Sequence, residues 1–155
     1  ALSETGHTDL AYTLLLQEKF PSWLFSVRMG ATTIWEHWDG INEQGDIWRP
    51  SMNSFNHYAY GAVADWMYGV MLGITPDEGK PAYEHIHLAP LPDKRLSFAK
   101  ASVNTRRGLV KSEWRIEGDT VYYDFTVPAD STADIVIDGK TTTVGGGNHS
   151  FISKI

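Results

Sequence analysis

Apolar residues recur every three or four positions in three segments of the first half of the chain, and this spacing predicts helices. The first segment covers residues 9–17, and the second covers residues 23–29 and ends at Gly30, which suits a left-handed helix cap. The third and longest segment runs over residues 55–70 and stops at Gly73. Small or apolar residues also occupy its opposite side, so we expect this helix to be buried all round.

Residues 31–50, between the second and third helices, show no periodic pattern. They hold three tryptophans, four acidic residues and two glycines, and we expect them to form a long ordered loop. Loops of this length inside a compact domain are usually functional.

The second half of the chain alternates apolar and polar residues with the period of two that is typical of strands. Turn-forming pairs such as Gly118-Asp119 and Asp138-Gly139 separate the segments, as hairpins require. The predicted strands cover residues 96–104, 108–117, 120–127, 133–137, 141–144 and 150–155, with a further candidate at residues 85–88. One apolar face and one solvated face on each strand predict an antiparallel β-sandwich.

A proline-rich stretch separates these two patterns. The sequence therefore predicts an α + β chain in two parts, with helices over residues 1–75, a linker over residues 76–84 and a β-sandwich over residues 85–155. The three helices carry more apolar surface than they can bury against one another, so the helical part needs further neighbours. Such helices joined by aromatic and acidic loops are typical of a helical toroid with its active site at one rim.

Composition excludes several classes of function. A net charge of −6 offers no basic surface for a nucleic acid, and no apolar run approaches the roughly 20 residues that span a bilayer. The lack of cysteine excludes a disulfide framework and a thiolate nucleophile. We expect no nucleic-acid partner, no membrane partner and no cofactor. Residues 1–8 lack the regions of a signal peptide and read as the continuation of a longer chain.

Glu36 is the leading candidate for chemistry in the long loop. It lies between Trp35 and Trp38, whose indole rings could exclude water and form a platform for a sugar. Glycoside hydrolysis needs two carboxyl groups across the scissile bond, and Glu36 could supply one of them. A solvated loop acid is the competing interpretation. Three other acids of the loop have weaker claims: Asp39, Glu43 and Asp46.

Three histidines are further candidates for a functional site. His57 stands at the start of the third helix, where it could contact a ligand or satisfy free backbone groups. His85 and His87 alternate on a predicted strand, so both rings lie on one face as two possible metal ligands. The sequence shows no third ligand beside them, and we predict no metal site.

Four segments of the helical part share a pattern with a known family. They are Asp9-Leu10-Ala11-Tyr12, Pro21-Ser22-Trp23, Gly30-Ala31-Thr32-Thr33-Ile34-Trp35-Glu36 with Trp38-Asp39-Gly40, and Ser51-Met52-Asn53-Ser54-Phe55-Asn56-His57-Tyr58-Ala59-Tyr60-Gly61. Together they resemble the last helices of the α-L-rhamnosidases of glycoside hydrolase family 78. The similarity covers nearly all of residues 5–75 and continues more weakly into the β-domain.

The resemblance implies the last helices of an (α/α)6 barrel followed by an antiparallel β-sandwich, and hydrolysis of terminal α-linked L-rhamnose with inversion. It implies that Glu36 acts as the general base and that Trp35, Trp38 and His57 line the sugar pocket. The general acid of the family belongs to an earlier stretch of the barrel, to which nothing in this chain corresponds.

The resemblance therefore implies half an active site, inactive alone. Its partners would be the rest of the catalytic barrel and a rhamnose-containing glycan or glycoside, and the compartment stays open among bacterial cytoplasm, periplasm and the exterior. Two alternatives remain: a non-catalytic carbohydrate-binding β-sandwich module, or another (α/α)6 glycosidase.

Overall fold

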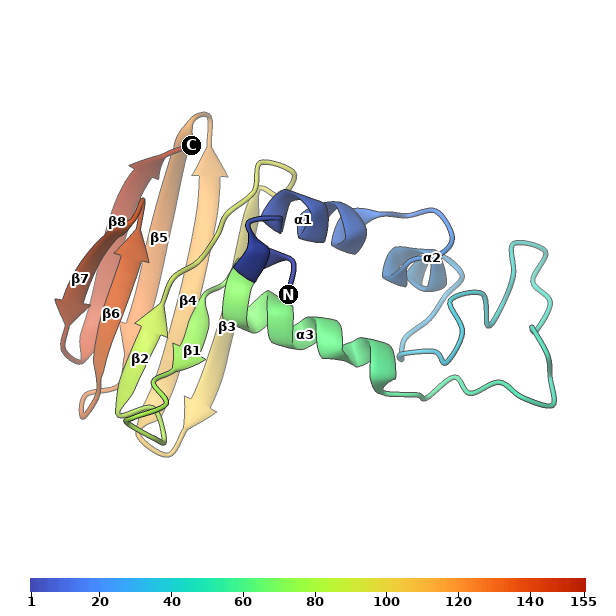
Figure 1. The fold of residues 1–155 in the computed structure, drawn as a ribbon, viewed down its shortest axis with the longest axis horizontal. Coiled ribbons are helices and arrows are strands. Elements are labelled where there is room, and N and C mark those ends of the chain that lie inside the picture. Colours follow the sequence, from blue (N-terminus) through green and yellow to red (C-terminus); the bar gives the residue numbers. More distant parts are fainter. The chain divides into compact units, whose positions relative to one another are not determined.

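The computed structural model describes residues 1–155 as two compact units, Ala1–Ala64 and Asp65–Ile155. Short helices and a long loop make up the first unit, and eight strands dominate the second (Figure 1). Because the two units are separately compact, each is described by itself.

The first two predicted helices are confirmed in the first unit. After a 3-10 turn at Ser3–Thr5 (η1), helix α1 spans Thr8–Leu16 and helix α2 spans Trp23–Arg28. The Ser22 hydroxyl caps α2 by accepting a backbone N–H from its first turn at 3.0 Å. Gly30 has a φ of 91°, the left-handed value expected just beyond a helix end.

The third helix consists of three successive kinds of turn. These are 3-10 (η2, Ala59–Ala62), α (α3, Val63–Trp66) and π (η3, Met67–Met71). The helix thus begins four residues later than the predicted start at Phe55. The Phe55 carbonyl accepts the Thr33 hydroxyl, and the His57 N–H donates to the Ile34 carbonyl at 2.8 Å. Backbone groups already bonded to a distant segment are not available for helical hydrogen bonds.

The expected all-round burial of this helix is wrong for the chain as it stands. Tyr60, Met67 and Tyr68 are between 36% and 43% exposed, although the pattern places small or apolar residues on both sides of this helix. Within the 155 residues, these side chains keep more than a third of their surface exposed.

Two four-stranded sheets form the second unit, and the predicted sandwich is confirmed. One sheet has the order β1-β2-β6-β7, with β1 at Ile74–Pro76, β2 at His85–Leu88, β6 at Thr132–Ile137 and β7 at Lys140–Val144. The other has the order β3-β4-β5-β8, with β3 at Phe98–Thr105, β4 at Gly108–Glu117, β5 at Thr120–Val127 and β8 at Gly147–Lys154. Neighbouring strands are antiparallel except β2 and β6, which run parallel. The sequence had not predicted β1.

Alternating residues of the strands fill the core of the sandwich. Those of β4 and β5 include the fully buried Trp114, whose indole N–H donates to the Met71 carbonyl at 2.9 Å. The buried Ser112 hydroxyl donates to the Leu72 carbonyl at 2.7 Å. These two bonds tie the end of the third helix to the sandwich.

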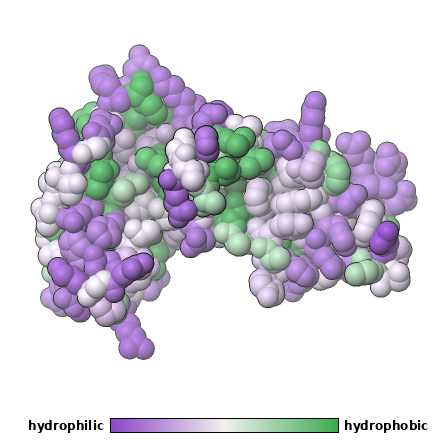
Figure 2. Space-filling model, viewed as in Figure 1, coloured by the Kyte–Doolittle hydropathy of each residue, from purple (hydrophilic) through white to green (hydrophobic).

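The first unit buries few apolar side chains. Only three of the sixteen buried hydrophobic residues belong to it: Tyr12, Phe25 and Trp35. Several large apolar side chains of this unit are more than 40% exposed, namely Leu10, Leu14, Phe20, Val27, Ile47, Met52 and Tyr58. Figure 2 shows hydrophobic residues exposed among the hydrophilic residues of the molecular surface. No helix of the chain combines the length and apolar character needed to cross a membrane.

Candidate functional site

Residues 34–36 and 54–57 are joined by backbone hydrogen bonds and carry two leading candidates, Glu36 and His57. The backbone N–H of Glu36 donates to the Ser54 carbonyl at 2.8 Å, and the N–H of His57 donates to the Ile34 carbonyl at 2.8 Å. Glu36 and His57 therefore lie on paired, antiparallel segments, although 20 residues separate them in the sequence.

Trp35 fixes the backbone on which Glu36 stands. Its ring is 6% exposed and meets the Phe55 ring edge to face, with centroids 5.2 Å apart. A Cβ atom added to Gly40 would lie 3.1 Å from both rings, so this glycine allows them to pack closely. Glu36 itself is half-buried. Trp35 thus packs mainly as a core residue, with little of its ring open to a ligand.

Trp38 belongs to an aromatic cluster formed by Trp23, Trp38 and Tyr60. The rings of Trp38 and Tyr60 stack with centroids 4.0 Å apart, and Trp23 meets Trp38 edge to face at 5.1 Å. The Trp23 indole donates to the Tyr60 carbonyl at 2.9 Å, and the Ser26 hydroxyl donates to the Trp38 carbonyl at 2.7 Å. These bonds hold the aromatic cluster in one arrangement.

His57 lies at an open depression of about 580 Å³. This volume falls in the range of small-molecule sites, roughly 300–1,000 Å³. The lining residues are Thr33, Ile34, Asn56, His57, Tyr58, Ala59, Gly61 and Ala62. Glu36 does not line it, so the two residues are linked by the backbone pairing of their segments and not by a shared cavity.

The ring of His57 also supports the start of the third helix. Its Nδ1 accepts the backbone N–H of Ala59 at 3.4 Å. A neutral ring that accepts at Nδ1 carries its proton on Nε2. His57 can therefore satisfy a free helical N–H and still offer one donor to a ligand.

Two supporting residues escaped the sequence analysis. The Asn53 amide donates to the carbonyls of Gly40 and Trp48, at 3.1 and 3.0 Å, and so fastens the long loop. The buried atoms Nε2 of His37 and Oδ1 of Asn53 have no hydrogen-bond partner within the chain. An unsatisfied buried polar atom costs free energy, so a group that reached either atom would gain a hydrogen bond. No local spacing distinguishes these residues from other loop polar residues.

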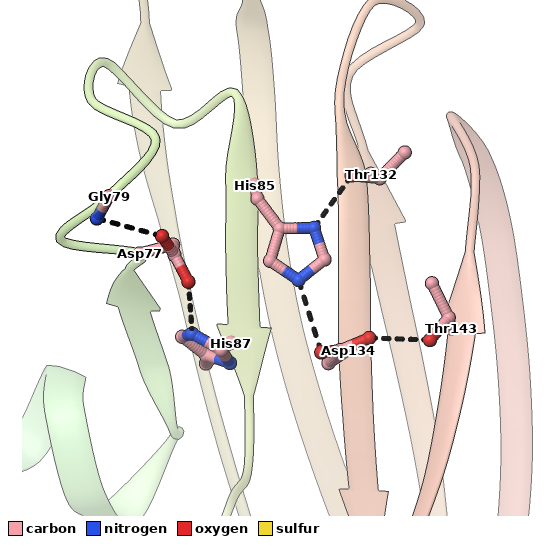
Figure 3. A network of polar contacts seen from close by, with 7 residues as sticks. All are labelled: Asp77, Gly79, His85, His87, Thr132, Asp134 and Thr143. Atoms are coloured by element: carbon pink, nitrogen blue, oxygen red, sulfur yellow. Dashed lines mark hydrogen bonds and ion pairs between the residues drawn. The ribbon is translucent and has the colours of Figure 1, made fainter.

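A second polar cluster lies on the sandwich, where β2 and β6 run side by side (Figure 3). The sequence analysis found no third ligand for His85 and His87, and this was wrong, because Asp134 of β6 lies beside them. Asp134 Oδ2 is 3.1 Å from His85 Nε2, and Asp77 Oδ2 is 3.0 Å from His87 Nε2.

Hydrogen bonds lower the pKa values of both carboxyl groups in this cluster. The bond from His87 lowers the pKa of Asp77, and bonds from Thr143 and then His85 lower the pKa of Asp134. Both carboxyl groups are therefore ionised at neutral pH.

Comparison with known proteins first defines the class of the chain. Residues 1–71 match the family model of the bacterial alpha-L-rhamnosidase 6 hairpin glycosidase domain, and residues 73–151 match that of the bacterial alpha-L-rhamnosidase C-terminal domain. The chain thus combines the last helices of an (α/α)6 barrel of the glycosidase type with a β-sandwich. It belongs to the bacterial α-L-rhamnosidase family, which confirms the resemblance seen in its motifs.

Individual relatives agree with this assignment. An alpha-L-rhamnosidase of Formosa agariphila is 44% identical over 136 residues, which cover 88% of this chain and 14% of that protein. The crystal structure of Streptomyces avermitilis alpha-L-rhamnosidase complexed with L-rhamnose matches with a TM-score of 0.88 and 36% identity, over 99% of this chain and 17% of that one. The alpha-L-rhamnosidase of Aspergillus terreus matches with a TM-score of 0.90 and 35% identity, over 97% and 18%. The chain spans less than one fifth of the length of these relatives.

Proposed function

We propose that this chain supplies the general base and part of the sugar pocket of an inverting α-L-rhamnosidase. Glu36 is the base that activates the attacking water. The observation that carries the proposal is the pairing of the Glu36 and His57 segments, since it groups the loop acid with a histidine at an open depression.

The chemistry requires a second carboxyl group from elsewhere in the barrel. In inverting glycosidases the two carboxyl groups stand roughly 6.5–9.5 Å apart, which leaves room for the water between base and sugar. Glu36 can accept a proton from that water, but the leaving oxygen must receive its proton from the general acid. The 155-residue chain alone should therefore be inactive.

The substrate side of the proposal rests on the aromatic cluster and on His57. Flat aromatic rings suit the apolar faces of sugars, and the Nε2 proton of a neutral His57 can donate to a sugar hydroxyl. Terminal α-linked L-rhamnose is the proposed sugar, because a relative that matches over 99% of this chain was crystallised with L-rhamnose.

Replacing Glu36 by Gln in the whole enzyme tests the base directly. The amide keeps the size of the side chain but cannot accept the proton, so kcat should fall by about 10²–10⁴-fold while substrate affinity changes little. Glu43→Gln is the matched control, since Glu43 is an exposed acid of the same loop, and its kcat should stay at the wild-type value.

Proton NMR of the first sugar released should show the inverted anomer. A retained anomer, or near-normal turnover by Glu36→Gln, would refute the assignment of Glu36 as the base of an inverting enzyme. If the chain binds a rhamnoside and Glu36→Gln does not lower the turnover of the whole enzyme, a carbohydrate-binding role replaces the catalytic one.

A further inference from the structure

The outer face of the sheet that contains β2 and β6 gathers three groups able to bind one metal ion. Ile86 and Leu88 are fully buried in the core, so the alternating His85 and His87 face outward. The parallel register places Asp134 of β6 directly opposite His87. One ligand atom from each of His85, His87 and Asp134 lies within 4.8 Å of the other two.

The second polar atom of each group is already held by a neighbour (Figure 3). His85 Nδ1 lies 2.6 Å from the Thr132 hydroxyl, which leaves Nε2 for a metal. His87 Nε2 lies 3.0 Å from Asp77, which leaves Nδ1. The second oxygen of Asp134 accepts the Thr143 hydroxyl at 2.6 Å, which leaves Oδ2.

Such outer partners are typical of metal sites, where the other nitrogen of a ligating histidine contacts a carboxylate or another polar group. Asp77 is itself oriented by the backbone N–H of Gly79 at 2.9 Å. Each histidine therefore has one ring nitrogen directed by the fold. The other nitrogen of His85, Nε2, pairs with Asp134 Oδ2, and a metal bound by both atoms would replace that contact.

Distances and access also suit a divalent transition metal. Tetrahedral zinc, with bonds of about 2.0–2.2 Å, sets neighbouring ligand atoms about 3.4 Å apart. The pair His85 Nε2 and Asp134 Oδ2, at 3.1 Å, is already close to this spacing. The His87 side chain is 41% exposed and the Asp134 side chain 27%, so an ion can reach the site from solvent although the His85 side chain is only 10% exposed.

We propose that His85, His87 and Asp134 form a binding site for a divalent transition metal, with imidazole, imidazole and carboxylate ligands. Imidazole nitrogen selects zinc, copper or nickel over magnesium or calcium. Water would complete the coordination. The ion would join β2 to β6, the one parallel pair among the six strand pairings, and so stabilise a contact that no hairpin turn holds together.

Zn²⁺ titrated into the metal-free 155-residue chain tests the site by calorimetry. One equivalent should bind, and the ring NMR signals of His85 and His87 should shift while those of the other histidines stay in place. Loss of an outer partner alone typically lowers metal affinity about 10–100-fold, so Asp77→Asn should bind one equivalent that much more weakly. Removing a ligand, in His87→Ala, should weaken binding at least about 100-fold.

His149→Ala is the matched control, because it removes a histidine of β8 outside the proposed site and should bind like the wild type. Circular dichroism checks that each variant is folded. If His87→Ala is unfolded, the isosteric variant Asp134→Asn tests the loss of a ligand in its place. Three results would each overturn the proposal: no saturable binding by the wild type, unchanged binding by the folded ligand variants, or an equal loss in His149→Ala.

Discussion

Deleting residues 65–84 should severely destabilise the sandwich, even though seven of its eight strands remain. The proline-rich stretch places the start of the β-domain at residue 85, but β1 at Ile74–Pro76 pairs with β2 and belongs to the same sheet. The comparison is therefore between a chain of residues 65–155 and one of residues 85–155.

The expected loss follows from the side chains that the shorter chain lacks. Met71, Leu72 and Ile74 are 3–5% exposed, and full burial of such side chains is worth about 1.5–3 kcal/mol each. These values are upper estimates, because unfolded chains already bury part of their surface. Even half of their total is a large part of the 5–15 kcal/mol that stabilises a typical domain.

Two hydrogen bonds add to this loss. The Trp114 indole and the Ser112 hydroxyl would lose their acceptors, the carbonyls of Met71 and Leu72. Each lost hydrogen bond costs about 0.5–1.5 kcal/mol, because water can reach the donors once the segment is removed.

Urea unfolding followed by circular dichroism measures the difference. We expect a cooperative transition for residues 65–155 and none, or a far lower midpoint, for residues 85–155. Trp114→Phe should destabilise the longer chain by about 2–4 kcal/mol, since both a hydrogen bond and volume are lost. Equal stability of the two chains would show that β1 and the end of the third helix contribute nothing to the sandwich.

Three other substitutions test local features of the second unit by thermal unfolding. In Gly73→Ala the new Cβ would lie 2.1 Å from the backbone carbon of Ala89, at a φ of 66°, so we expect a loss of at least about 3 kcal/mol. Gly118→Ala, with a φ of 61° and no atom within 4 Å, should lose only about 1–2 kcal/mol, and equal losses would contradict the steric argument. The hydrogen bond from Arg95 lowers the pKa of Asp93 in the folded chain. The contribution of this bond to stability is therefore present above the unfolded-state pKa of about 3.9 and is lost as the pH falls through the folded-state pKa. The Tm difference between the wild type and Asp93→Asn should therefore shrink at acidic pH, and a constant difference would contradict this.

Local patterns predicted the strands better than the third helix. Strands β4 and β5 occupy the predicted residues, because alternation and the Gly118-Asp119 turn are both local properties of the sequence. The start of the third helix was missed because residues 33–34, more than 20 positions earlier, bind its first predicted turn. Strand β1 was missed because three residues that end in proline carry almost no alternation.

The candidate sites show the same difference between features set by local sequence and features set by long-range pairing. Glu36 and Trp38 could be singled out from one short segment, since both residues lie in the same motif. Asp134 could not be joined to His85 and His87, because a parallel pair gives no turn from which its register can be read.

The proposed base owes its position to long-range bonds and not to a core of its own unit. The Glu36 backbone is held by Ser54 and by the packing of Trp35, in a unit that buries only three hydrophobic side chains. Catalysis depends on geometry held to fractions of an ångström, and a site supported by so small a core is not held that firmly. Contacts that cover the exposed apolar residues should therefore both stabilise this unit and orient Glu36. The base must therefore be tested in the whole barrel. In the isolated chain, even the wild type lacks the general acid and the contacts that orient Glu36, so a Glu36 variant has no active reference.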